Sequence, residues 1–244
     1  MSTLSNKNVL IGVTGGIAAY KICFLTRLLI KKGADVKIII TPDAKKFVSP
    51  LTLSTLSKNT VSSYFVDKDD NWINHVDFAK WADLMIIAPL TATTLAKLSI
   101  GLSDNLLIAT YLSSTCPVFI APAMDLDMYQ HPTTYENLEK IKNHSIQVIP
   151  AESGELASGL DGEGRMAEPE TIIQYTENYF NQQLKLKNQK ILITAGSTQE
   201  AIDPVRFIGN HSTGKMGYAL AKKALEFGAE VSLISGPTHL ELHH

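Results

Sequence analysis

The sequence has few cysteines, few aromatic residues and no excess of basic charge. Its 244 residues include two cysteines and 7% aromatic residues, and the formal net charge is -2. Two cysteines without C-x-x-C spacing predict buried, reduced thiols rather than a disulfide framework or a metal site. The charge gives no indication of a nucleic-acid-binding protein or of a membrane-surface protein.

Long hydrophobic runs are also absent. No run approaches the ~18 apolar residues that a transmembrane helix needs, and the polar residues 1–7 lack the apolar core of a signal peptide. We therefore expect a cytoplasmic protein with no membrane association. Hydrophobic residues make up 45% and charged residues 19% of the chain, as in ordinary globular proteins.

A strand, a glycine turn, a helix and a second strand are predicted at the start of the chain. They are NVLIGV (8–13), the turn 14–16, a helix over 17–32 that ends at Gly33, and a strand over 36–40. Further strands are predicted at 84–88, 118–121 and 146–149, with helices at 91–98, 105–112, 132–143 and 169–180. This alternation predicts an α/β fold with a doubly wound parallel sheet, in which ligands bind beyond the carboxyl ends of the strands.

Three later stretches set the domain organisation. Residues 151–168 contain four glycines and little apolar periodicity, which indicates a loop, either a linker or the favoured alternative of a lid. The polar stretch 181–189 is typical of a linker. Residues 190–244 repeat the opening pattern but are too few for a doubly wound domain. We therefore predict a first domain over 1–180 and the first βαβ unit of a second Rossmann-like domain over 190–244, whose final LELHH is either native sequence or a tag.

Two segments carry residues suited to binding a phosphate. Gly15 and Gly16 at a strand-to-helix turn allow backbone N–H groups to approach an anion. The spacing is not G-x-G-x-x-G and no acidic residue ends the second strand, which favours a mononucleotide over NAD, with a tight turn alone as the alternative. In APLTATT (88–94), three threonines stand at a strand end, where they cap a helix or bind a phosphate or a flavin edge.

Two residues suit proton transfer. His75 lies in NHVD (74–77), between a polar loop and an apolar segment, and is either structural or a catalytic base. Asp125 lies in APAMDLDMY (121–129) directly after a strand, and is either a helix N-cap or a ligand-facing residue. The residues alone leave these alternatives open.

Taken in order, these segments resemble one family. GVTGGIAAYK, HVDFAKWADLMIIAP, LSDNLL, PAMDLDMY and GEGRM are similar to the flavin-containing cysteine decarboxylases, specifically the bacterial phosphopantothenoylcysteine decarboxylases. DPVRFI (203–208) and GKMG (214–217) resemble the start of phosphopantothenate–cysteine ligases, which are commonly fused behind the decarboxylase. The resemblance implies a Rossmann-like flavoprotein that converts 4′-phosphopantothenoylcysteine to 4′-phosphopantetheine with FMN, in coenzyme A biosynthesis.

The resemblance also implies roles for particular residues. His75 matches the family's base, the segment Gly164, Arg165 and Met166 belongs to the substrate lid, and Asn210 matches a ligase residue. A complete ligase domain would use CTP and Mg²⁺. Because relatives form trimers with FMN between subunits, we expect a homotrimer or a larger assembly built from trimers. The implied FMN contacts are Gly15, Gly16, Ile17, Thr41, Pro89, Thr91, Ala92, Thr94, Ala123 and Met124.

Two positions depart from the family pattern. Asp125 stands where the pattern has asparagine, and Ser158 stands where relatives have a proton-donating cysteine. An ionised carboxylate would repel the substrate carboxylate, and a hydroxyl is a weaker acid than a thiol. Either the decarboxylase is impaired, or a protonated Asp125 both donates to the substrate carboxylate and returns the proton. We favour the second hypothesis, which makes His75, Asp125 and Ser158 the candidate catalytic residues.

Two rival functions stay open. A flavin prenyltransferase shares the glycine-rich start but predicts neither the HVD segment nor a ligase module. A flavin-binding regulatory or scaffold protein is compatible with the altered Asp125 and Ser158. Release of CO2 from the substrate by a yellow protein separates the decarboxylase from both.

Overall fold

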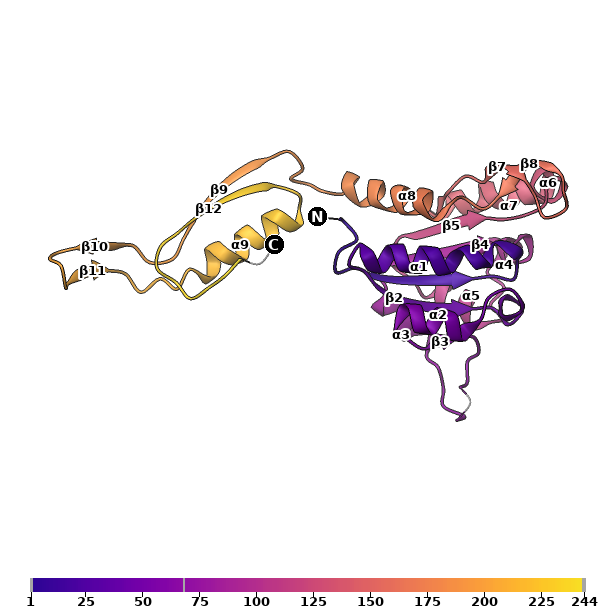
Figure 1. The fold of residues 1–244 in the computed structure, drawn as a ribbon, viewed down its shortest axis with the longest axis horizontal. Coiled ribbons are helices and arrows are strands. Elements are labelled where there is room, and N and C mark those ends of the chain that lie inside the picture. The colour runs from indigo at the N-terminus through magenta and orange to yellow at the C-terminus, as the bar shows by residue number, and fades with distance from the viewer. Residues whose placement is uncertain (1, 68, 243–244) are drawn as a thin grey trace. The chain divides into compact units, whose positions relative to one another are not determined.

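The computed structural model describes residues 2–67 and 69–242, and its contacts divide the chain into two compact units, 1–177 and 178–244. The helix α8 (Pro169–Gln182) passes through this division (Figure 1). The expected domain boundary at residue 180 falls inside that helix. The segment LELHH (240–244) was expected to be either native sequence or a tag. Its last two residues, 243 and 244, lie outside the described residues.

The first unit contains a six-stranded sheet in the order β3-β2-β1-β4-β5-β6. All five pairings between neighbouring strands are parallel. The predicted doubly wound parallel sheet is therefore confirmed. The strands are β1 (Asn8–Val13), β2 (Asp35–Ile40), β3 (Val61–Ser62), β4 (Leu84–Leu90), β5 (Val118–Pro122) and β6 (Gln147–Val148).

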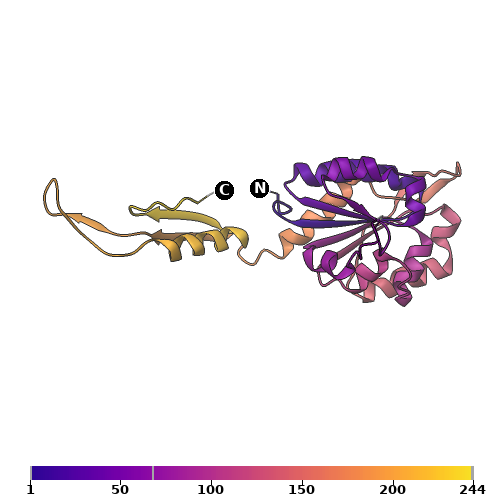
Figure 2. The ribbon, with the colours of Figure 1, turned by 90° about the horizontal axis from the view of Figure 1, so that it is seen from below.

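Helices cover both faces of this sheet. Figure 2 shows the indigo helix α1 on one face and the pink helices α6 and α7 on the other. The chain moves outward from β1 to β3 on one side and from β4 to β6 on the other, so the topology reverses between β1 and β4. The helices are α1 (Ile22–Lys31), α2 (Pro50–Ser57), α3 (His75–Trp81), α4 (Ala92–Ile100), α5 (Leu106–Leu112), α6 (Leu126–Gln130) and α7 (Pro132–Asn143).

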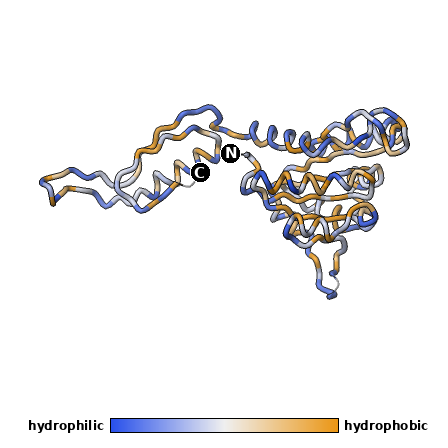
Figure 3. Tube along the Cα trace, viewed as in Figure 1, coloured by the Kyte–Doolittle hydropathy of each residue, from blue (hydrophilic) through white to orange (hydrophobic). Residues whose placement is uncertain are grey.

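The core lies where α5 and its neighbours pack on the central strands. Leu10, Ile87 and Ile120 are fully buried and belong to one apolar cluster. Figure 3 shows the hydrophobic colour along these strands. A Cβ atom on Gly12 would overlap the Leu107 side chain, so this glycine allows α5 to approach β1 closely.

Residues 151–168 were expected to be a loop without secondary structure, and this prediction is wrong. They form an antiparallel hairpin of β7 (Glu152–Glu155) and β8 (Asp161–Arg165). A Cβ atom on Gly162 would lie 2.6 Å from Leu126 Cδ1. At Gly164, with φ of +149°, a Cβ atom would overlap the Met124 carbonyl oxygen. The glycines that indicated a loop instead allow β8 to pack against the start of α6.

Other predicted boundaries also change. β4 continues through Pro89 to Leu90 and β5 includes Pro122, so these prolines do not end the strands where expected. The predicted helix over 17–32 begins as a 3₁₀ helix, η1 (Ile17–Lys21), before α1. A second 3₁₀ helix, η2 (Pro42–Lys46), follows β2.

The second unit contains a parallel pair of strands, β9 (Lys190–Ala195) and β12 (Glu230–Ser235), joined through α9 (Lys215–Glu226). A short hairpin, β10 (Gln199–Ala201) and β11 (Phe207–Gly209), lies between β9 and α9 in the chain. Ala221 and Ala224 of α9 are buried, whereas Leu192 and Ile234 on the strands are exposed. In the described part of the chain, no helix combines the length and apolarity required to cross a membrane.

Candidate functional site

A cavity of about 630 Å³ lies at the carboxyl ends of β1, β4 and β5. This size is within the usual range for small-molecule sites, and the position is where doubly wound sheets bind ligands. Residues after each of the three strands and residues of the β7–β8 hairpin form its wall. The wall comprises residues 15–18, 20–21, 91–93, 123–125, 128, 155–157 and 164–166.

The turn after β1 depends on close packing at one of its two glycines. A Cβ atom on Gly15 would lie 2.8 Å from Asp43 Cβ and 3.1 Å from the Asp43 carbonyl carbon, so a larger residue would displace η2. Gly16 has room for a Cβ atom, whose nearest contact would be Thr91 Cγ2 at 3.5 Å. Gly15 is therefore required for packing, while Gly16 leaves open space beside the cavity.

The turn after β4 presents backbone donors to the cavity. Thr14 Oγ1 donates to the Pro89 carbonyl (2.6 Å) and accepts from the Thr91 N–H (3.1 Å), which joins the ends of β1 and β4. Thr91 precedes α4 but makes no capping bond with its side chain, because its hydroxyl donates to Thr94 Oγ1 (3.3 Å). The first-turn N–H groups of α4 have no acceptor in their own helix, which suits an anion.

The structure brings eleven of the predicted site residues to the cavity wall. Three others support the wall from behind it. Thr41 donates its N–H to the Val13 carbonyl at 2.9 Å, Pro89 accepts from Thr14, and Thr94 is buried. The eleven are Gly15, Gly16, Ile17, Thr91, Ala92, Ala123, Met124, Asp125, Gly164, Arg165 and Met166.

Asp125 both caps a helix and lies on the wall. Its Oδ1 accepts from the Leu126 N–H at 2.7 Å, at the start of α6. The preceding Met124 donates its N–H to the Gly164 carbonyl at 2.9 Å, which joins this turn to β8. The two predicted roles of Asp125, helix cap and ligand-facing residue, are thus compatible. Its role as an acid stays a prediction.

Ser158 does not reach the wall. It lies in the turn between β7 and β8, is exposed, and accepts from the Leu160 N–H at 3.4 Å. The neighbouring Glu155, Leu156 and Ala157 line the cavity instead. The structure therefore does not place Ser158 and Asp125 together at the cavity.

His75 also lies outside the wall. It is the first residue of α3, next to the N-cap Asn74, whose Oδ1 accepts from the Val76 N–H at 3.0 Å. The imidazole stands edge-on to Phe65 with 6.2 Å between ring centroids. Its Nδ1 is buried and has no hydrogen-bond partner among the described residues. Such an unpaired buried nitrogen is unusual and calls for a functional explanation.

Asn210, the predicted ligase residue, belongs to the second unit. Its Nδ2 donates to Thr198 Oγ1 at 2.9 Å, and its Oδ1 accepts from the Ser212 N–H at 2.9 Å. The first bond joins the segment after β11 to the turn after β9, and the second is local. Across the residues that the structure describes, no group of three or more His, Cys, Asp and Glu side chains could hold a metal ion.

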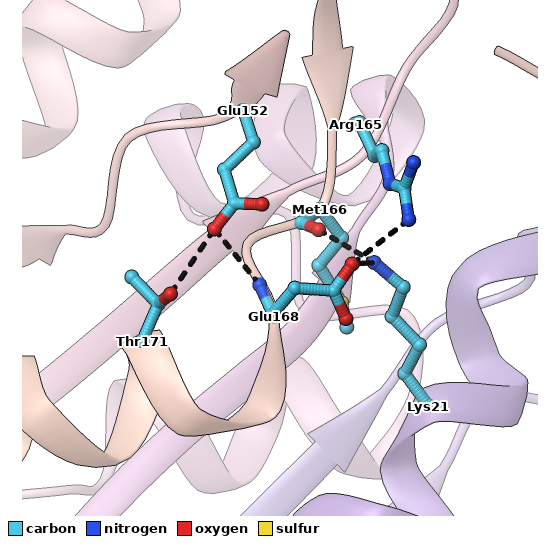
Figure 4. Close-up of polar contacts among 6 residues, drawn as sticks. All are labelled: Lys21, Glu152, Arg165, Met166, Glu168 and Thr171. Atoms are coloured by element: carbon cyan, nitrogen blue, oxygen red, sulfur yellow. Dashed lines mark hydrogen bonds and ion pairs between the residues drawn. The ribbon is translucent and has the colours of Figure 1, made fainter. Parts of the chain in front are cut away.

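The sequence analysis missed Lys21 as a site residue. Its side chain is 5% exposed, and Nζ donates to the Met166 carbonyl (2.9 Å) and to Glu168 Oε1 (2.8 Å), as Figure 4 shows. The hydrogen bond from Lys21 is the main cause that holds the pKa of Glu168 below its ordinary value. A lysine within the apolar stretch IAAYK (17–21) was the available signal. Tyr20 and Met128 of the wall were also missed.

Residues 1–181 match the family model described as Flavoprotein. This chain belongs to the flavoprotein family. Residues 186–244 match the model of the DNA/pantothenate metabolism flavoprotein C-terminal domain.

Individual relatives agree with both matches. The coenzyme A biosynthesis bifunctional protein CoaBC of Bacillus subtilis (strain 168) is 48% identical over 241 residues, which are 98% of this flavoprotein and 59% of the relative. The chain therefore spans about three fifths of the length of the curated relatives it matches.

Two solved structures resemble the first unit. A PPC decarboxylase mutant in complex with pantothenoylaminoethenethiol is 32% identical, with a TM-score of 0.64 over 72% of this chain and 98% of that chain. The FMN binding protein AtHal3 is also 32% identical, with a TM-score of 0.63 over 73% and 98% of the two chains. The Rossmann-like flavoprotein fold is thus confirmed.

Proposed function

We propose that this flavoprotein binds FMN in the cavity and decarboxylates 4′-phosphopantothenoylcysteine to 4′-phosphopantetheine, a step of coenzyme A biosynthesis. The cavity at the ends of β1, β4 and β5 is the observation that carries this proposal. The names of the relatives support it, because they print coenzyme A biosynthesis, PPC decarboxylase and FMN binding.

The residues of the wall fit a flavin mononucleotide. The first-turn N–H groups of α4, at Ala92 and Thr93, suit the phosphate of the cofactor. Ile17 and Met124 provide apolar contacts for a flat ring. Gly16 leaves open space next to the ring position. We therefore assign FMN binding to the predicted cofactor residues of the wall, with Thr41, Pro89 and Thr94 as supports.

The reaction requires an electron acceptor beside the substrate. Bound FMN would supply a reversible two-electron oxidation of the substrate cysteine, which the side chains of the protein cannot provide. The protein binds and orients the substrate and moves protons. We propose that His75 accepts the proton during oxidation of the substrate, since an imidazole can do so near neutral pH.

His75 does not line the cavity of its own copy. We propose that the protein forms a homotrimer, or a larger assembly of trimers, in which His75 of one copy lies beside the cavity of the next. Exposed apolar side chains near the cavity support such an interface: Ile17 and Tyr20 on η1 and Phe24 on α1 are 61%, 50% and 58% exposed. The unpaired His75 Nδ1 supports it too.

We propose that Asp125 donates a proton to the substrate. Oδ1 already accepts the Leu126 N–H, so we place the proton on Oδ2. A protonated carboxyl group there would donate to the substrate carboxylate rather than repel it. An impaired decarboxylase that binds flavin as a regulatory or scaffold protein is the alternative, because Ser158 replaces a thiol and lies away from the wall.

For the second unit we propose a part in phosphopantothenate–cysteine ligation. Asn210 would act there, and a complete ligase domain would use CTP and Mg²⁺. The match of residues 186–244 to a pantothenate-metabolism domain supports this assignment. We further propose that both reactions take place in the cytoplasm, where thiols such as Cys23 and Cys116 stay reduced.

The proposed activity is tested with purified protein and synthetic 4′-phosphopantothenoylcysteine. We expect a yellow protein that releases FMN on denaturation and that produces CO2 and 4′-phosphopantetheine. Release of a dinucleotide such as FAD or NAD would contradict the cofactor assignment. A yellow protein that produces no CO2 would support the regulatory or scaffold function instead.

A further inference from the structure

We propose that Glu168 is a positioning residue that fixes the base of the β7–β8 hairpin on the cavity wall. The hairpin base is defined as Glu152, Arg165 and Met166, and the hairpin tip as residues 156–160. Both parts contribute residues to the wall. The effect on catalysis rests on the proposed decarboxylase function, whereas the effect on the hairpin does not.

The first observation is that the buried ammonium group of Lys21, on η1, is paired with the segment that follows β8. Lys21 Nζ lies 2.8 Å from Glu168 Oε1 and 2.9 Å from the Met166 carbonyl oxygen, and its side chain is 5% exposed. Arg165 Nη2 lies 2.9 Å from the same carboxylate oxygen. A buried ammonium group is costly without a counter-charge, so Lys21 strongly favours the position of Glu168 that these bonds require.

The second observation is that Glu168 also connects to the other strand of the hairpin. Glu152 Oε1 accepts from the Glu168 N–H and from Thr171 Oγ1, each at 3.1 Å. Figure 4 shows these bonds together with those of Lys21 and Arg165. The residue before α8 is thus bonded to β7 through its backbone and to β8 through its side chain. One residue therefore determines where both strands of the hairpin base lie.

The hairpin tip is held much less firmly. Its hydrogen bonds are internal: Leu156 N–H to the Leu160 carbonyl (2.8 Å), Gly159 N–H to the Leu156 carbonyl (2.9 Å) and Leu160 N–H to Ser158 Oγ (3.4 Å). Among the described residues, no bond joins the tip to the rest of the unit. The position of the tip over the cavity therefore depends on the base, and so on Glu168.

This arrangement predicts which part of the site Glu168 controls. The hairpin side of the wall, residues 155–157 and 164–166, would shift if the base loosened. The turns after β1 and β4 are joined to each other by the hydroxyl of Thr14, whose bonds to Pro89 and Thr91 do not involve Glu168. Loss of Glu168 should weaken substrate binding and leave FMN binding in place.

Glu168→Gln tests the proposal, because glutamine keeps the size and removes the charge. Cleavage of the Leu156 and Leu160 bonds by chymotrypsin, measured by mass spectrometry without substrate, should become about tenfold faster, as expected for one lost charge-assisted bond. KM should rise about tenfold, with kcat within about twofold and FMN content unchanged. Glu168→Asp, which keeps the charge, should restore part of the protection.

Glu177→Gln is the matched control. Glu177 lies on α8 and pairs with Lys32 at 3.1 Å, but it does not contact the hairpin. This variant should behave as the wild type in both cleavage and KM. If Glu177→Gln exposes the tip as much as Glu168→Gln does, general loosening of α8 explains the effect and the proposal is wrong.

A double variant covers the case in which Glu168→Gln does not fold because Lys21 is left unpaired. Lys21→Met with Glu168→Gln removes both charges, a replacement that folded proteins often tolerate. It should fold, and its tip should still be cleaved faster than in the wild type. Wild-type cleavage rates in the folded variants would overturn the proposal. Because cleavage is measured without substrate, this result is independent of whether the protein decarboxylates.

Discussion

Two glycine turns in this flavoprotein resemble each other in sequence but differ in their surroundings. The first follows β1, which pairs with β2 on one side and β4 on the other and has five buried residues. The second, at Gly196, follows β9, which pairs with β12 and has no fully buried residue. The same βαβ unit is thus enclosed in the first case and open in the second.

A glycine turn after a strand is not sufficient to make a binding site. Around the first turn, the ends of β4 and β5 and the β7–β8 hairpin complete a cavity. Around the second, Gly196 packs closely against Gly214 and Gly236, where a Cβ atom would lie 3.1 Å from the Gly236 nitrogen. The glycines of the second turn serve backbone packing in this structure. The contrast can be tested by removing residues that only one of the two units possesses.

The largest expected effect comes from His75→Asn. If the site of the first unit requires His75 of another copy, substrate-dependent flavin reduction should fall about 100-fold or more, as for loss of a general base. FMN content should be unchanged, because His75 is not among the residues to which FMN binding is assigned. Anaerobic rapid-mixing absorbance measures the reduction rate. Normal reduction in the variant would make His75 a structural residue.

The next prediction compares the stability cost of shortening a side chain in the buried core of the first unit with the cost on an exposed strand of the second. Ile86→Ala on the fully buried β4 should cost about 2–5 kcal/mol of unfolding free energy, from lost burial and a residual cavity. Leu192→Ala on β9 should change stability by less than about 0.5 kcal/mol, because Leu192 is 65% exposed. Urea unfolding followed by far-ultraviolet circular dichroism compares the variants. A similar cost at both positions would show that the second unit is enclosed in solution.

Much of the enclosed sheet was predictable from sequence. Runs such as NVLIGV and LMIIA are apolar on both faces, which only a buried parallel strand requires, and glycine or proline marks the adjoining turns. The predicted loop over 151–168 was wrong because glycine also serves where two segments pack closely together. Gly162 and Gly164 allow β8 to pack on Met124 and Leu126, and the same residues are typical of loops.

The site was predictable only in part. Residues next to strand ends, such as Gly15, Thr91 and Asp125, share one edge of the sheet by topology, so their convergence follows from the order of strands. Lys21 lies on η1, and its partners Met166 and Glu168 are more than 140 positions away. No local periodicity indicates such a contact. The assembly that would bring His75 to a cavity is likewise not encoded in any local pattern.

A smaller effect is expected from the wall residue Asp125. Asp125→Asn should lower turnover about tenfold, because the amide binds the substrate carboxylate but supplies no acid. Asp125→Asn with Ser158→Cys should recover activity, since the hairpin tip then carries a thiol. The two effects should therefore be strongly non-additive. Steady-state rates of the two single variants and of the double variant provide the test.

Additive effects of the two substitutions would show that neither residue is the acid. Glu155 would then be the next candidate, because it lines the same cavity, followed by Glu163 on β8. The hydrogen bond from Leu126 to Asp125 Oδ1 provides a structural control. An asparagine oxygen can accept the same bond, so Asp125→Asn should retain α6 and the fold.

The smallest effect is expected at low pH, where the contribution of one carboxylate to stability can be compared between the two units. The pKa of Glu168 lies below its ordinary value of 4.5, chiefly through its hydrogen bond from Lys21 and also through Arg165. The pKa of Asp203, in the second unit, lies below its ordinary value of 3.8, chiefly through the backbone N–H groups of Arg206 and Val205. A group whose pKa is depressed by folding contributes stability above its unfolded pKa, and this contribution is lost as the pH falls through the folded pKa.

The first unit should therefore lose stability as the pH falls below about 4.5, and Glu168→Gln should make that decline shallower. The effect is modest because the Glu168 side chain is 40% exposed and solvent screens its ion pairs. Both tryptophans, Trp72 and Trp81, lie in the first unit, so tryptophan-detected thermal unfolding between pH ~3 and ~6 reports that unit alone. Asp203→Asn should leave this signal unchanged, because the side-chain bonds of Asp203 to described residues are all within its own turn. If instead Asp203→Asn changes the tryptophan signal as much as Glu168→Gln does, the two units unfold as one cooperative body, and their difference in enclosure does not make them independent in stability.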